Sequence, residues 1–184
     1  MKYVSNITDK LTQSSFWKLL ATIEKLLLII SSLTVVITLC LVVLGRHVLH
    51  YAFLGYTEIL VLAAFWMYFI GASYGSCEES HITADILSQF VGEKAKLKLS
   101  IFSKCVQVAV GIPLICLSFG MLQYDIKTQQ ATVDLEIPLL WSQAPIFIGF
   151  ALMTFYAVIY IVRDIYKLKH FSEIQAELTT TDVK

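Results

Sequence analysis

Four side chains that can bind protons or metal ions occur close together in the stretch SCEESHITAD: Glu78, Glu79, His81 and Asp85. These residue types suggest a metal site or a proton relay, and on a helix His81 and Asp85 are four positions apart and share one face. Two ligands at a wet edge are too few for a structural metal site. Helix capping, solvation at a membrane surface or contact with another subunit is therefore the favoured interpretation of this cluster.

Two histidines raise the question of haem. His47 and His50 follow the first long apolar run of the chain. Histidines that ligate haem in a helical bundle lie on facing helices inside the membrane, whereas these two lie at the outer end of one run. The sequence contains no Ser-His-Asp set, phosphate-binding loop or glycine-rich nucleotide motif. We therefore expect no catalytic residue, no metal ion and no cofactor, and we do not expect an enzyme.

The segments that must position these groups have the composition of a membrane protein. Of the 184 residues, 57% are hydrophobic and 15% are charged, and the mean hydropathy is +0.72. Such a chain is too apolar for an ordinary soluble domain. Its net charge of zero predicts no general attraction to nucleic acid, so no nucleic-acid partner is expected. The cysteines are interpreted as small core residues: Cys40, Cys77, Cys105 and Cys116.

Four apolar runs are long enough to cross a bilayer whose hydrocarbon core is about 30 Å thick. They cover residues 26–45, 59–77, 105–124 and 143–162. Before the fourth run, Ser142 is predicted to be the N-cap and Pro145 to lie in the first turn, with Trp141 at the membrane interface. The predicted fold class is an all-α integral membrane protein, a single membrane domain with four transmembrane helices.

Two amphipathic segments accompany the runs. Residues 15–25 and 80–92 are predicted to form short helices that lie along the membrane surface, and the first leads into the first span. In the first of them, Lys18, Glu24 and Lys25 form the polar face. His81 and Asp85 are predicted to fix the turn into the second. The tail 170–184 is expected to be frayed.

The distribution of positive charge predicts the orientation. Four lysines precede the first run, four lie between the second and third runs, and four lysines or arginines follow the fourth, so twelve of the fourteen basic residues share one side. Only Arg46 and Lys127 lie on the other side. By the positive-inside rule, both termini and the 78–104 loop are expected to be cytoplasmic, and the 46–58 and 125–136 loops to face outward.

Small and charged residues mark candidate contacts of the second run. Gly71 and Gly75 share one helix face and allow close approach of a neighbour, which is either another helix of this chain or a different subunit. Glu58 opens the same run. Its carboxylate either interacts with the helix dipole or forms an ion pair with Arg46 or with a partner.

These residues resemble a known family. Arg46, then GYTEILVLAAFWMYFIGASY, then SHITADIL is similar to the small membrane subunit of tripartite ATP-independent periplasmic (TRAP) transporters. The stretch LEIPLLWSQAPIFIGFALM, which contains Trp141, extends the similarity to about residues 20–165. Together, the resemblance and the residue patterns give these candidate structural or subunit-interface residues: Arg46, Glu58, Trp66, Gly71, Gly75, His81, Asp85 and Trp141.

The resemblance implies a bacterial inner-membrane protein that pairs with a large multi-span subunit and leaves transport to it. A periplasmic substrate-binding protein would deliver an organic acid, of the dicarboxylate or sialic acid class, and an ion gradient, usually of sodium, would drive uptake. The small subunit would then be a scaffold embedded in the lipid bilayer. Two alternatives remain open: a membrane anchor of a redox enzyme complex, and a small carrier that works alone. The uncharged spans argue against the carrier.

Overall fold

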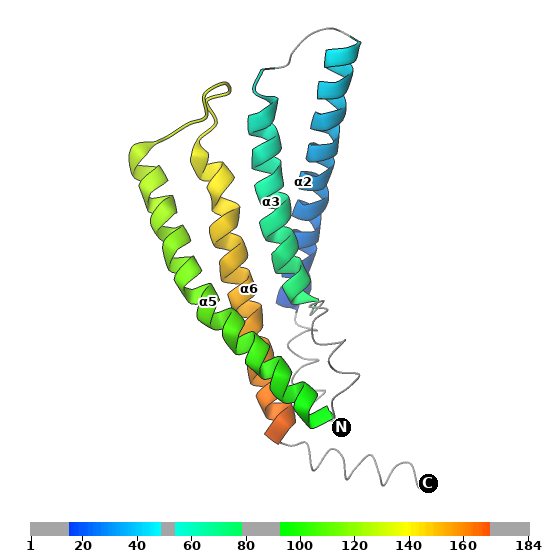
Figure 1. Cartoon of the computed structure of the whole chain (residues 1–184), viewed down its shortest axis with the longest axis vertical. Helices are drawn as coiled ribbons and strands as arrows, with labels where there is room; N and C mark the ends of the chain where they lie inside the picture. The colour runs from blue at the N-terminus through cyan, green and yellow to red at the C-terminus, as the bar shows by residue number, and fades with distance from the viewer. Residues whose placement is uncertain (1–14, 49–53, 79–92, 170–184) are drawn as a thin grey trace.

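The computed structural model describes residues 15–48, 54–78 and 93–169, and this part of the chain is mainly helical (Figure 1). The helices are α2 (Ser15–His47), α3 (Tyr56–Cys77), α5 (Glu93–Thr128) and α6 (Leu139–Lys169). Each is long and apolar enough to cross a membrane, which confirms the four predicted helices. The predicted helix 80–92, with His81 and Asp85, and the tail 170–184 lie outside the described residues.

Three of the helices are much longer than the runs predicted to span the membrane. α2, α5 and α6 have 33, 36 and 31 residues, which correspond to about 50, 54 and 46 Å of helix. α3 has 22 residues, or about 33 Å, close to the thickness of a bilayer core. Residues 15–25, predicted as a surface helix, form the first part of α2 without a break, because no glycine or proline interrupts the segment.

The predicted start of the fourth helix is wrong. α6 begins at Leu139, so Ser142 is not its N-cap and Pro145 lies inside the helix. The connection before α6 explains the earlier start. Leu139 donates its N–H to the Gln130 carbonyl over 2.9 Å. A bridge between Ala131 and Pro138 closes the connection and delivers the chain to the helix at that point.

The helices stand in an open row rather than a closed bundle. α2 packs on α3, α3 packs on α6, and α6 packs on α5 (Figure 1). α3 and α6 are therefore the inner helices, and α2 and α5 are the edges. We name the two ends of the row after the limits of α3: the Gly55 end, where α3 begins, and the Cys77 end, where it stops.

Much of the apolar surface faces outward in this row. Large side chains of α2 such as Leu26, Leu33 and Leu41 are more than half exposed. Three of the four cysteines are exposed as well, which corrects the prediction that they are core residues: Cys40, Cys105 and Cys116. The reason is physical, since an apolar residue in a membrane protein gains little by turning away from lipid.

Candidate functional site

Glu58 joins α3 to the connection between α5 and α6 at the Gly55 end. It lies in the first turn of α3. One carboxylate oxygen accepts the backbone N–H of Asp134 over 2.8 Å, and the other accepts that of Leu135 over 3.0 Å. Within the described residues no ion pair links Glu58 to Arg46, so that alternative is not formed in the structure. Arg46 itself is exposed in the last turn of α2.

Gly55 makes this contact possible. Its φ of 82° lies in the left-handed region, which favours glycine. A Cβ at this position would stand 2.8 Å from Cγ of Leu135, the residue whose N–H binds Glu58. The turn that starts α3 and the loop that precedes α6 are therefore fitted to each other.

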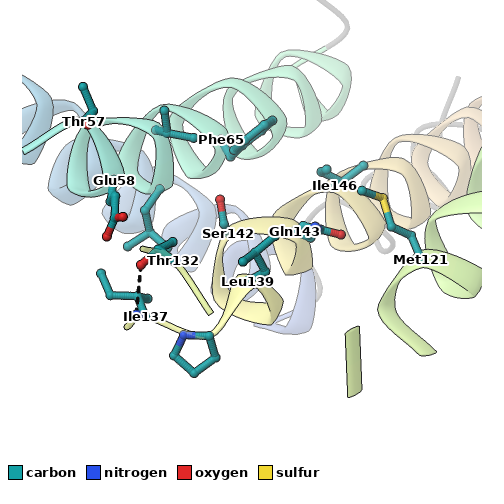
Figure 2. A pocket seen from close by; sticks show the side chains of 13 residues that line it. Thr57, Glu58, Phe65, Met121, Thr132, Ile137, Leu139, Ser142, Gln143 and Ile146 are labelled. Carbon is teal, nitrogen blue, oxygen red and sulfur yellow. Dashed lines mark hydrogen bonds between the residues drawn. The ribbon is translucent and has the colours of Figure 1, made fainter. Parts of the chain in front are cut away.

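A cavity of about 410 Å³ lies beside this contact. It is formed by the start of α3, the start of α6 and the loop between α5 and α6, with Met121 of α5 at one side (Figure 2). Its wall is mainly apolar. The Thr132 hydroxyl faces it and accepts the N–H of Ile137 over 3.0 Å. Gln143 also lines it, and its buried Oε1 makes no hydrogen bond.

Trp66 and Trp141, both singled out in the sequence, meet in the structure. The Trp66 indole N–H donates to the main-chain oxygen of Trp141 over 3.0 Å. In an uninterrupted helix that oxygen would bind the N–H four residues later, but Pro145 has none. Trp66 of α3 therefore supplies the donor that α6 lacks, and the two inner helices are joined.

The two glycines of α3 have different surroundings. A Cβ on Gly71 would stand 3.2 Å from Leu28 Cδ1, so Gly71 faces α2 of the same chain. Among the described residues, nothing lies within 4 Å of a Cβ built on Gly75. Sequence reasoning missed a third position, Gly149 of α6, where a Cβ would be 2.9 Å from the main-chain oxygen of Phe69. Gly149 therefore allows the backbones of α6 and α3 to approach each other closely.

The sequence interpretation also misplaces Glu24. The amphipathic pattern of residues 15–25 predicts it on the polar face of a surface helix, but it is 2% exposed. Its Oε1 accepts the Ser73 hydroxyl over 2.7 Å, which joins α2 to α3 near the Cys77 end. Tyr156 of α6 is fully buried next to this pair, and its ring meets that of Trp17 edge-on at 5.0 Å.

Asp164 joins α6 to α5 at the same end of the row. Its carboxylate contacts Lys104 Nζ at 2.6 Å, the Ser100 hydroxyl at 2.9 Å and Arg163 Nε at 3.2 Å. The Lys104 and Arg163 cations also lie 5.2 Å and 4.7 Å from the centre of the Tyr160 ring. The positive charges are thus held between a carboxylate and an aromatic face.

Tyr160 connects this ion pair to the rest of the row. Its hydroxyl donates to the carbonyl of Cys77, and its ring meets Trp17 at 6.1 Å. Through these contacts all four described helices are linked at the Cys77 end. Sequence reasoning did not identify this arrangement, although Trp17, Glu24 and Ser31 recur every seven residues on one face of α2, a spacing that could have indicated it.

The arrangement offers structural contacts rather than a reaction centre. Among the described residues, no group of three or more His, Cys, Asp or Glu side chains is placed to hold a metal ion. Buried polar side chains such as Glu24, Ser73 and Asp164 instead bind one another or their neighbours across helix interfaces. His81 and Asp85 lie outside the described residues, so the role proposed for them in the turn after Cys77 stays a prediction.

Comparison with known proteins identifies the family. A search of curated proteins found no match. Residues 35–167, which are most of the chain and include the last part of α2, all of α3 and α5 and nearly all of α6, match the family model described as "Tripartite ATP-independent periplasmic transporters, DctQ component". The match confirms the resemblance read from the residues around Arg46, Trp66 and Trp141. The chain therefore belongs to the DctQ family, the small membrane component of TRAP transporters.

Proposed function

We propose that this chain is a non-catalytic scaffold for the large membrane subunit of a secondary, ion-gradient-driven TRAP transporter. The transporter takes up an organic acid of the dicarboxylate or sialic acid class, with sodium as the coupling ion, and receives it from a periplasmic substrate-binding protein. The chain lies in the bacterial inner membrane, with the Cys77 end and both termini on the cytoplasmic side. Family membership and the charge asymmetry of the sequence support this proposal.

The observation that carries the scaffold role is the open row of helices. A row leaves both edge helices with one broad apolar side. Only 6% of the most apolar stretch of α2 is buried within the chain. A four-helix protein that worked alone would gain by closing around its own core. Broad uncovered faces suit a subunit that extends another membrane protein and meets lipid elsewhere.

The positions of the buried acidic side chains favour the same role. Glu24 and Asp164 lie near the Cys77 end, and Asp125 lies near the other end in the last turns of α5. Transport pathways place ionisable groups or broken helices near the membrane midplane. Here Glu24 and Asp164 fasten helices together close to their ends, as a rigid support requires.

Co-purification tests the proposal directly. The tagged chain is expressed in its native operon and purified in mild detergent, and mass spectrometry identifies what accompanies it. We expect a stoichiometric large multi-span membrane protein. The same co-purification is repeated with Gly75→Leu and with Gly120→Leu. Both glycines are uncovered in the described structure and lie on different helices, so the recovery of the large membrane protein compares the two positions.

Three results would contradict the scaffold role. The chain purifies alone, it purifies with a soluble redox enzyme and a haem absorption band, or it transports substrate by itself in liposomes. The second result would support the membrane anchor of a redox complex. The third would support a self-sufficient carrier.

A further inference from the structure

Glu24 has a carboxyl group that is only half satisfied by hydrogen bonds. Oε1 accepts the hydroxyl of Ser73, but Oε2 is buried and has no hydrogen-bond partner. An ionised carboxylate buried in this way loses its hydration and gains only one donor in return. Burial of an unpaired charge is strongly unfavourable, and such groups usually become neutral instead.

A second unsatisfied oxygen faces it. The Tyr156 hydroxyl lies beside the Glu24 carboxyl, Tyr156 is fully buried, and its oxygen makes no hydrogen bond. The two oxygens come from α2 and α6, and Ser73 approaches from α3. A phenol oxygen can accept a hydrogen bond as well as donate one.

Among the described residues, no positively charged group compensates for a negative charge on Glu24. Tyr74 and Cys77 of α3 and Tyr156 of α6 interact electrostatically with Glu24, and Glu78 interacts in turn with Tyr74 and Cys77. Within the described part of the chain no lysine or arginine forms an ion pair with Glu24. Among the described residues its charged and titratable neighbours are neutral or acidic, so a negative charge at this position would have only the Ser73 and Tyr156 hydroxyls to offset its burial.

We propose that Glu24 is a proton-binding site: the folded protein holds this carboxyl in its neutral form, and the proton on Oε2 is donated to the Tyr156 hydroxyl oxygen. The bound proton removes the buried charge and satisfies both unpaired oxygens at once. Ser73 continues to donate to Oε1, and the Tyr156 proton points toward the nearby Cys77 sulfur, a weak acceptor. The result is an uncharged joint that fastens α2 to α3 and α6.

This joint makes stability depend on pH with a definite sign. As the pH rises, the unfolded chain releases the Glu24 proton first, and the folded state keeps it to a higher pH. Where the folded state binds more protons than the unfolded state, raising the pH lowers the free energy of unfolding. The Glu24 joint therefore strengthens the fold in mildly acidic solution and weakens as the pH rises.

Infrared spectroscopy of the purified full chain, with whatever partner accompanies it, tests the proton directly. At neutral pH we expect the carbonyl stretch of a protonated carboxyl group in the wild-type protein. The band should disappear in Glu24→Gln and persist in Glu78→Gln, which alters an exposed carboxyl, and in Asp125→Asn, which alters another buried one. Absence of the band from the wild-type protein overturns the proposal, and so does a band that only Asp125→Asn removes.

Thermal unfolding supplies an independent measurement. Gln retains an acceptor for Ser73 and places an N–H where the proposed O–H points. We expect the Tm of Glu24→Gln to lie within about 2 °C of wild type at about pH 5 and to exceed it at about pH 8. Glu24→Leu should lower the Tm at both. A Tm for Glu24→Gln as low as that of Glu24→Leu overturns the proposal. A sodium- or potassium-dependent rise in the wild-type Tm that Glu24→Gln lacks also overturns it, in favour of a cation site.

Discussion

The indole N–H of Trp66 binds the main-chain oxygen of Trp141, an acceptor that Pro145 leaves without a partner in its own helix. A proline in the second turn of α6 is thereby tolerated, because a neighbouring helix satisfies the carbonyl that the proline frees. The same contact fixes the rotation of α3 relative to α6. The pair therefore joins the two inner helices through backbone chemistry as well as side-chain packing.

Replacing Trp66 with Phe should cost about 1–2 kcal/mol of unfolding free energy, because it leaves the Trp141 oxygen unpaired while keeping an aromatic ring. In a Pro145→Ala background the same replacement should cost less, since alanine at position 145 restores an N–H to the helix. A double-mutant cycle measured by denaturant unfolding in detergent would reveal this coupling. Strictly additive effects would show that the indole contact does not replace the missing helical bond.

Removing the Glu58 carboxylate should loosen the connection between α5 and α6. Glu58→Ala takes away both acceptors that hold the N–H groups of Asp134 and Leu135. We expect limited proteolysis to cut within residues 129–138 several-fold faster, as mass spectrometry of the fragments would record. Arg46→Ala is the matched control, because Arg46 forms no ion pair with Glu58 in the described structure. Equal cleavage rates in the two variants would contradict the role given to Glu58.

Glycine substitutions should distinguish helix contacts within the chain from uncovered faces. Gly149→Ala places a methyl group 2.9 Å from the Phe69 carbonyl oxygen, so α3 and α6 must move apart. We expect a loss of about 1–3 kcal/mol, typical of overpacking. Gly75→Ala should be neutral or slightly stabilising in the isolated chain, because nothing lies within 4 Å and alanine favours helix. Thermal unfolding of the purified variants compares the two directly.

Replacing one partner of the ion pair between α5 and α6 should lower the free energy of unfolding more than replacing both partners. Lys104→Met leaves the carboxylate of Asp164, whose side chain is 4% exposed, with fewer donors. We expect a loss of about 3 kcal/mol, in the range measured when one partner of a buried pair is removed. Lys104→Met combined with Asp164→Leu should recover part of it, as denaturant unfolding of the three variants would show. If the double variant is as unstable as the sum of the two single ones, the pair contributes no coupling.

The sequence alone determined the number and approximate position of the helices. Long apolar runs with few glycine or proline residues must satisfy their backbone groups internally in lipid, and only a helix does that within one segment. The residues around Arg46, Trp66 and Trp141 likewise indicated the family without knowledge of the helix packing, because they form a local pattern. The sequence did not decide the roles of these candidate residues. For Glu58, for example, it left two alternatives, an interaction with the helix dipole and an ion pair.

Only the tertiary structure decided which helices meet and through which faces. In lipid, apolar residues occur all round a helix, so hydrophobic periodicity gives little information about the buried side. That is why the sequence pattern places Glu24 on a surface, although α3 and α6 bury it, and why it does not assign the partners of Trp66 and Asp164. Those contacts join residues 49 to 75 positions apart. A contact between such distant residues depends on the packing of whole helices, which no single segment encodes.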